Sequence, residues 1–153
     1  MIRVVLDSNI FISLLISREK GKLKRLYALW RSSKFINYIS LISLRELVDV
    51  VSRSKIQDKA GIEIEEIKNL LREVVDSSVL IKPLHRCPKV LDDEEDQVFL
   101  EMAATAKAHY IVSGDKGLLK LGEYQASENQ PLIKIISVSE FLEEMEKAKK
   151  SKR

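Results

Sequence analysis

Cysteine and long apolar runs are both scarce in this sequence, and each shortage excludes a class of protein. The single cysteine, Cys87, rules out an internal disulfide and a Cys-x-x-Cys zinc site. No stretch approaches the roughly 20 consecutive apolar residues that a membrane-spanning helix needs. The N-terminus lacks an apolar segment followed by a cleavage site of small residues, so we expect a cytoplasmic protein with no membrane partner.

The chain has the length and composition of one folded domain. A domain near its 153 residues buries roughly 68–70% of the surface of its unfolded chain. Hydrophobic residues make up 45% of the sequence, enough to fill such a core. We predict one domain over residues 1–146, followed by a basic, disordered tail over residues 147–153.

Basic residues are concentrated in two segments. The last seven residues include five lysines and arginines and no acidic residue, and without them 21 basic residues face 23 acidic ones. The net charge therefore falls from +3 to −2 when the tail is left out. The second segment, from Arg18 to Lys34, has seven basic residues opposed only by Glu19. Such a run either follows a phosphate backbone or forms the exposed face of one helix.

Strand and helix patterns alternate along the chain. Residues 2–6 form a short, β-branched apolar run that is typical of a buried parallel strand. The capping box Ser137-Val138-Ser139-Glu140 predicts the start of the last helix. This alternation predicts a three-layer α/β/α fold with a mostly parallel sheet. Further strands are predicted at 35–39, 79–81, 110–112 and 132–136, and further helices at 10–16, 23–30, 41–51, 64–75 and after the acidic run 92–96.

Two aromatic residues lie on the apolar stripe of the predicted helix 23–30. Leu23, Leu26, Tyr27 and Trp30 have the i, i+3, i+4, i+7 spacing of one helical face. The two rings could stack on bases, or they could pack in the core or in a subunit contact. Their position on an apolar stripe favours packing.

Four acidic residues are expected at one edge of the sheet. Asp7 ends the first strand and Asp115 follows strand 110–112, while Glu46 and Asp96 lie in the first turns of helices that follow other strands. Ligand sites in open α/β sheets lie beyond the carboxyl ends of the strands. Carboxylates gathered there raise each other's pKa, and a divalent cation relieves the repulsion. A ligand set of oxygen atoms alone favours Mg²⁺ or Mn²⁺ over zinc.

Each of these acids alone also has a purely structural interpretation. Asp7 and Asp96 could cap helices, and Glu46 could complete a capping box that begins at Ser43. Asp115 could simply turn the chain after Gly114. Their joint placement is what favours a metal site.

Four short motifs surround these acids in the order of the chain. They are Leu6-Asp7-Ser8-Asn9, Ser43-x-x-Glu46-Leu47, Asp93-x-x-Asp96-x-x-Phe99-Leu100 and Ile111-Val112-Ser113-Gly114-Asp115. Together they resemble the successive motifs of the PIN-domain nucleases over residues 2 to about 140. Within that superfamily the chain is most similar to the VapC-like toxins of type II toxin–antitoxin pairs.

The resemblance implies a PIN-like fold and cleavage of single-stranded RNA by water that a divalent cation activates. It implies Mg²⁺ or Mn²⁺ as cofactor, a cognate antitoxin as partner, and we also expect a homodimer. One position departs from the family, since many relatives carry an acid where this chain has Gly117. The implied catalytic metal ligands are Asp7, Glu46, Asp96 and Asp115; Asn9 and Ser113 match orienting positions, and Asp93 matches an accessory acid at the mouth of the site.

An acidic edge repels RNA, so basic residues elsewhere must hold the phosphate backbone. The internal basic run is close in sequence to Asp7, whereas the tail is far from it. We therefore predict that Lys22, Lys24 and Arg25 contact RNA and that the tail contributes little.

Two other functions are compatible with parts of this pattern. A non-catalytic RNA-binding or scaffold module could use the same fold, although it would not need four converging acids. A phosphatase of the haloacid-dehalogenase type also begins with an aspartate after its first strand. That chemistry calls for a second acid at Asn9 and another aspartate at Leu119, and this chain has neither.

Overall fold

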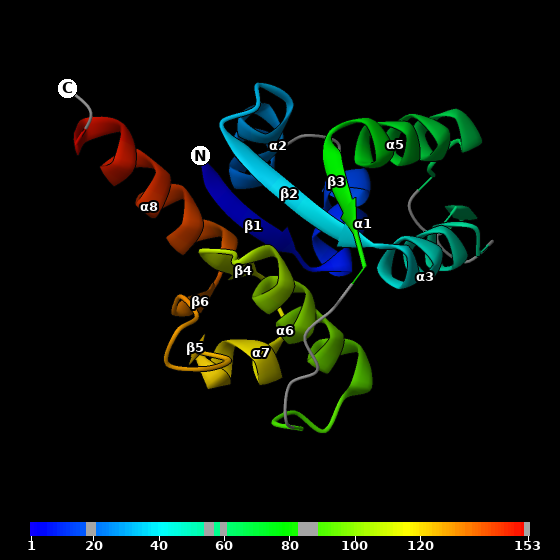
Figure 1. Ribbon diagram of the computed structural model, residues 1–153. Coiled ribbons are helices and arrows are strands. Elements are labelled where there is room, and N and C mark those ends of the chain that lie inside the picture. Colours follow the sequence, from blue (N-terminus) through cyan, green and yellow to red (C-terminus); the bar gives the residue numbers. More distant parts are fainter. Residues whose placement is uncertain (18–20, 54–56, 59–60, 83–88, 152–153) are drawn as a thin grey trace.

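The computed structural model describes residues 1–17, 21–53, 57–58, 61–82 and 89–151 (Figure 1). Arg18, Lys20 and Cys87 lie outside the described residues, as do Lys152 and Arg153. The strands are β1 (Ile2–Leu6), β2 (Phe35–Ser40), β3 (Ser78–Ile81), β4 (Tyr110–Val112), β5 (Glu123–Tyr124) and β6 (Ile133–Ile136). The helices are α1 (Ser8–Ser17), α2 (Gly21–Arg31), α3 (Leu41–Val51), α5 (Ile64–Asp76), α6 (Glu94–Ala106), α7 (Lys116–Leu121) and α8 (Val138–Ser151).

The strands form one sheet in the order β3-β2-β1-β4-β6-β5. All neighbouring strands are parallel except the short β5, which pairs antiparallel with β6. The chain builds outward from β1 to β2 and β3, and then restarts on the other side of β1 with β4. The order of the strands therefore reverses between β1 and β4, and this is where ligand sites of open α/β sheets lie. The mostly parallel sheet predicted from the sequence is confirmed.

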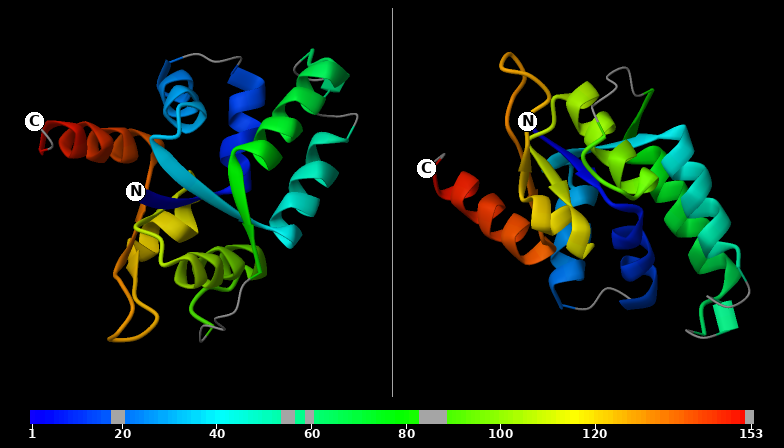
Figure 2. Two further views of the ribbon diagram at one scale, coloured as in Figure 1. Left: turned by 45° about the horizontal axis from the view of Figure 1, so that its top comes forward. Right: turned by 90° about the horizontal axis from the view of Figure 1, so that it is seen from below.

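Helices cover both faces of the sheet and bury two apolar clusters (Figures 1 and 2). On one face, side chains of α1, α2, α3, α5 and α8 pack together with Leu6, Phe35 and Ile39. On the other face, α6 and α7 pack Leu100 and Leu118 against residues of β1, β4 and β6. The structure thus has the predicted three layers, because strands β1, β4 and β6 bury side chains on both faces of the sheet.

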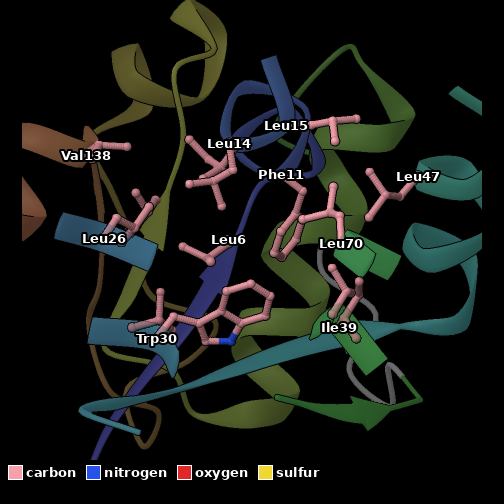
Figure 3. Packing of buried hydrophobic residues seen from close by; sticks show 14 of the residues in the cluster. Leu6, Phe11, Leu14, Leu15, Leu26, Trp30, Ile39, Leu47, Leu70 and Val138 are labelled. Atoms are coloured by element: carbon pink, nitrogen blue, oxygen red, sulfur yellow. The ribbon is translucent and has the colours of Figure 1, made fainter. Parts of the chain in front are cut away.

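Trp30 belongs to the first of these clusters (Figure 3). It is 2% exposed, and its ring centroid lies 5.4 Å from that of Phe11 and 6.0 Å from that of the half-buried Tyr27. Its indole N–H donates to the Ser77 carbonyl at 2.9 Å, so its one polar atom is paired. The packing interpretation of Trp30 is confirmed, and the ring is not accessible for stacking on a base.

A buried amide ties the first three strands together. Asn37 of β2 is fully buried; its Oδ1 accepts from the Leu6 backbone N–H at 3.0 Å, and its Nδ2 donates to the Ser78 hydroxyl at 3.0 Å. Both polar atoms are therefore paired, as a buried amide requires. These bonds tie β1 to β2 and β3 one residue before Asp7.

The end of the chain differs from the prediction. The capping box is present, since Glu140 N–H donates to Ser137 Oγ and Ser137 N–H to Glu140 Oε1, both at 3.2 Å. The helix that follows does not stop at residue 146 but continues to Ser151, so residues 147–151 are helical and not a disordered tail. Lys149 and Lys150 in its last turn interact favourably with the negative C-terminal end of the helix dipole. In the described part of the chain no helix is long and apolar enough to span a membrane.

Candidate metal centre

A cleft of about 190 Å³ lies at the carboxyl ends of β1 and β4. Asp7 follows β1 and Asp115 follows β4 after Ser113 and Gly114, so both enter the cleft where the strand order reverses. Glu46 reaches it from α3 and Asp96 from α6, on opposite faces of the sheet. The structure therefore brings all four predicted metal ligands to one cleft, with Asn9 and Asp93 also in its lining.

Asp7 is the most firmly held of these carboxylates. Its side chain is 3% exposed, and its Oδ2 accepts from the fully buried Ser113 hydroxyl at 2.6 Å. Its Oδ1 accepts from the Asn9 backbone N–H at 3.2 Å. Burial raises the pKa of Asp7, these two hydrogen bonds lower it, and the charges of Asp115 and Asp93 raise it again, with a net upward shift.

Ser113 links the ends of the two central strands. Besides donating to Asp7, its hydroxyl accepts from the Asp115 backbone N–H at 2.9 Å. Ser113 thus fixes the positions of two predicted ligands at once, although its own side chain does not line the cleft. Asn9 contributes through its backbone, because the Asp7 contact uses the Asn9 main-chain N–H and its side chain is exposed.

Three of the acids also serve the helices that they precede. Asp115 caps α7, its Oδ2 accepting from the Leu118 N–H at 3.0 Å. Asp93 stands before α6 and accepts from the Asp96 N–H at 3.3 Å. Asp7 accepts from Asn9 at the start of α1. The same side chains therefore accept hydrogen bonds from helix N–H groups and line the cleft, because a helix that starts at a strand end points its N–H groups at the cleft.

Asp96 has the largest change in acidity. Its pKa is raised to about 7 by burial first and then by the negative charges of Asp115, Asp93 and Asp7. The protonated form of Asp96 also donates a hydrogen bond to Asp115, which raises its pKa further. Without a cation, these carboxylates are thus close enough to resist simultaneous ionisation.

The capping-box interpretation of Glu46 is wrong. The N-cap of α3 is Ser40, whose Oγ accepts from the Ser43 N–H at 3.1 Å. Ser43 is therefore the third residue of the helix and is itself buried. Glu46 lies one turn further along, on the side of α3 that lines the cleft.

Two further charged residues of the cleft were not predicted. Asp49 of α3 and Arg53, two residues beyond the end of that helix, line the cleft together with Glu46. Arg53 donates to Asp49 at 3.0 Å and is the only cation in the described lining, against six carboxylates. The i, i+3, i+7 spacing of Glu46, Asp49 and Arg53 is the sequence signal that could have identified them.

The missing side chain of Gly117 leaves space beside two of the acids. A Cβ atom at this position would lie 3.1 Å from Asp115 Oδ2 and 3.9 Å from Asp96 Oδ2. A side chain here would therefore point at the predicted metal ligands. Because this chain has Gly117 where many relatives carry an acid, the cleft has one carboxylate fewer than theirs.

The chemistry of the lining fits a hard divalent cation. Its candidate ligands are carboxylates, the type of ligand that Mg²⁺ and Mn²⁺ prefer. Among the residues described here, no three acidic, histidine or cysteine side chains are already close enough to form a coordination shell. Side-chain rotation on fixed backbones would have to complete such a shell.

The predicted RNA-binding residues lie elsewhere. Lys22, Lys24 and Arg25 are exposed residues of α2, and none of them lines the carboxylate cleft.

Comparison with known proteins identifies a family and a relative of this chain. A family model described as PIN domain matches residues 3–117, a range that includes all four predicted ligands and ends at Gly117. An uncharacterised protein of Methanocaldococcus jannaschii is 34% identical over 152 residues, covering 95% of this chain and 93% of that protein.

A solved structure shares the fold. The crystal structure of VapBC2 from Rickettsia felis, bound to a DNA fragment from its promoter, contains a chain that superposes with a TM-score of 0.57. The match has 17% sequence identity and covers 89% of this chain and 98% of that one. Because the PIN-domain model matches residues 3–117, well over half of its length, this chain belongs to the PIN-domain family of nucleases.

Proposed function

We propose that this protein is an endoribonuclease that cleaves single-stranded RNA with the help of Mg²⁺ or Mn²⁺. The observation that carries the proposal is the meeting of Asp7, Glu46, Asp96 and Asp115 in one cleft at the reversal of strand order. Membership of a nuclease family supports phosphodiester hydrolysis as the reaction.

The four acids would hold the cation from fixed backbone positions. A divalent cation in such a site lowers the pKa of a bound water and stabilises the charge that develops on the phosphate. The protein's own contribution is positional, since Ser113 holds Asp7 and the backbone of Asp115 through bonds of 2.6 and 2.9 Å. Asp93 stands at the start of α6 and adds negative charge beside Asp96.

We further propose that the protein is the toxin of a toxin–antitoxin pair and that it forms a homodimer. The fold shared with a chain of the VapBC2 complex supports the first proposal. Exposed apolar residues of α3 and of the edge strand β3, among them Ile42 and Leu80, support the second. A short reading frame that overlaps or adjoins the gene and encodes a co-purifying protein would support the antitoxin. The cytoplasmic location also stays a prediction.

One assay tests the enzymatic proposal against both alternatives. The purified protein is incubated with a mixed pool of single-stranded RNA and, separately, with p-nitrophenyl phosphate, each in Mn²⁺ and in EDTA. We expect internal cleavage of RNA in Mn²⁺ alone and no turnover of the phosphomonoester. Intact RNA in both conditions would favour the binding or scaffold module. Turnover of p-nitrophenyl phosphate with intact RNA would favour the phosphatase.

A further inference from the structure

A second, larger cavity of about 510 Å³ lies between helices α2 and α8 and shares no lining residue with the carboxylate cleft. We call it the α2–α8 groove. Two acidic residues line it, Glu143 and Glu146, and they face four cations, which leaves a surplus of two positive charges. The cations are Lys22 and Arg25 of α2 and Lys147 and Lys150 of α8.

The groove joins the two basic segments that are far apart in the sequence. Lys22 Nζ donates to Ser139 Oγ at 3.4 Å, across 117 residues of chain. Arg25 pairs with Glu146 at 3.6 Å. Leu26 of α2 and Leu142 of α8 are buried in the same core cluster, so the two helices that form the walls of the groove are held by packing.

The cations of the groove are held weakly by their neighbours. The side chains of Arg25 and Glu146 are 60% and 54% exposed, and Lys147 approaches Glu144 only at 3.9 Å with 73% of its side chain exposed. Ion pairs so exposed to solvent contribute little to folding. These side chains can therefore exchange a carboxylate for a phosphate at small cost.

The groove begins near the sheet edge that carries the cleft. The Ser113 N–H donates to the carbonyl of Ile136 at 3.0 Å, and α8 starts two residues later. Ser139 lies in the first turn of α8, and Lys150 lies 11 residues further, a rise of roughly 16 Å along the axis. The line of cations thus leads away from the edge where Ser113 fixes Asp7 and Asp115.

We propose that the α2–α8 groove binds the phosphate backbone of single-stranded RNA, with Lys22, Arg25, Lys147 and Lys150 as the contacts. The proposal rests on the proposed function, because a cleft lined by six carboxylates repels a polyanion and needs a cationic surface to retain it. It changes the sequence-based assignment in two respects. Lys24 is exposed but does not line the groove, and the lysines near the C-terminus act with α2 instead of contributing little.

The experiment compares two double variants of equal charge. Lys22→Ala/Lys150→Ala removes one groove cation from each helix. Lys24→Ala/Lys149→Ala removes one exposed lysine from each helix outside the groove. Affinity for a fluorescein-labelled oligouridylate is measured by anisotropy over a range of salt concentrations, in EDTA so that metal-dependent cleavage cannot consume the probe. Thermal melts check that both variants are folded.

We expect the groove variant to bind roughly tenfold more weakly and its log–log salt slope to flatten by about 1.4, at about 0.7 per lost contact. The control variant should keep the slope of the wild type. Equal slopes for the two variants would overturn the proposal. Binding of poly-glutamate gives a second outcome that would overturn the proposal. If the groove variant kept the RNA slope of the wild type but lost binding of poly-glutamate, the groove would be assigned to an acidic protein partner. Cleavage in Mn²⁺ is scored separately, so a protein that binds RNA through the groove but never cuts it would refute only the proposed function.

Discussion

The carboxylate cleft and the α2–α8 groove differ in how firmly their charges are held. In the cleft, Asp7 is 3% exposed and is bonded to a fully buried serine at 2.6 Å. In the groove, the charged side chains are exposed, and the contacts of Lys22 with Ser139 and of Arg25 with Glu146 are 3.4 and 3.6 Å long. Hydrolysis requires charges fixed where the transition state develops, whereas a flexible polyanion can be held by mobile cations.

The two regions also differ in charge balance. Six carboxylates and one cation line the cleft, while four cations and two carboxylates line the groove. Burial and then the charges of neighbouring carboxylates raise the pKa of Asp96 to about 7, whereas the groove's charges are spread over solvent-exposed helix surfaces. Repulsion between like charges is therefore concentrated in the cleft, where the proposed cation would relieve it.

The largest expected effect is on catalysis and separates the two regions. Asp96→Asn should lower the rate of RNA cleavage roughly a thousandfold, because it removes a charged ligand of the proposed cation. The neighbouring Asp92→Asn is the control, since Asp92 is exposed and does not line the cleft. Cleavage of an end-labelled RNA in Mn²⁺ gives both rates. The cleft assignment is wrong if the two variants lose activity equally.

A second substitution tests whether α2 contributes charge or an aromatic surface to RNA binding. Trp30→Ala should reduce the free energy of unfolding by about 3–5 kcal/mol, because it empties a buried site and leaves the Ser77 carbonyl without its donor. Urea denaturation measures the loss, and Trp30→Phe should recover part of it. The salt slope of RNA binding should not change at temperatures where the variant is folded; a flatter slope would mean that the ring contacts RNA after all.

The smallest expected effect concerns pH and metal. The pKa of Asp96 is raised from an ordinary 3.8 to about 7, so between these values the folded protein binds more protons than the unfolded chain. The contribution of Asp96 to stability without metal should therefore be greatest below about pH 4, fall as pH rises from about 4 to about 7, and level off above that. Asp7, whose pKa is also raised, acts in the same direction.

Thermal melts from about pH 5 to about pH 8 measure this fall. Asp96 is partly exposed, so we expect a change in Tm of only about 2–4 °C for its contribution. Saturating Mn²⁺ should restore the loss near pH 8, because it binds the ionised folded state, and Asp96→Asn should flatten the metal-free profile. A metal response equal in Asp96→Asn and wild type would exclude the proposed site.

Much of the fold followed from local patterns. Strand β1 and helix α3 were predicted with their observed bounds, since a buried β-branched run and a regular apolar spacing depend on neighbouring residues alone. Helix α7 and strand β5 were not predicted. They contain six and two residues, too few for periodicity to distinguish them from a loop, and β5 exists only because β6 lies beside it.

The candidate site divides in the same way. Asp7 and Asp115 could be expected at one edge of the sheet from the sequence alone, because both follow recognisable strands and the carboxyl ends of parallel strands share that edge. Three contacts depend on how distant segments pack: Ser113 joins Asp7 to Asp115, Arg53 enters the cleft, and Lys22 and Lys150 line one groove. The physical reason is that spacing along a chain fixes which face of its own helix or strand a residue occupies. The packing of α2 against α8 depends instead on side chains more than 100 residues apart.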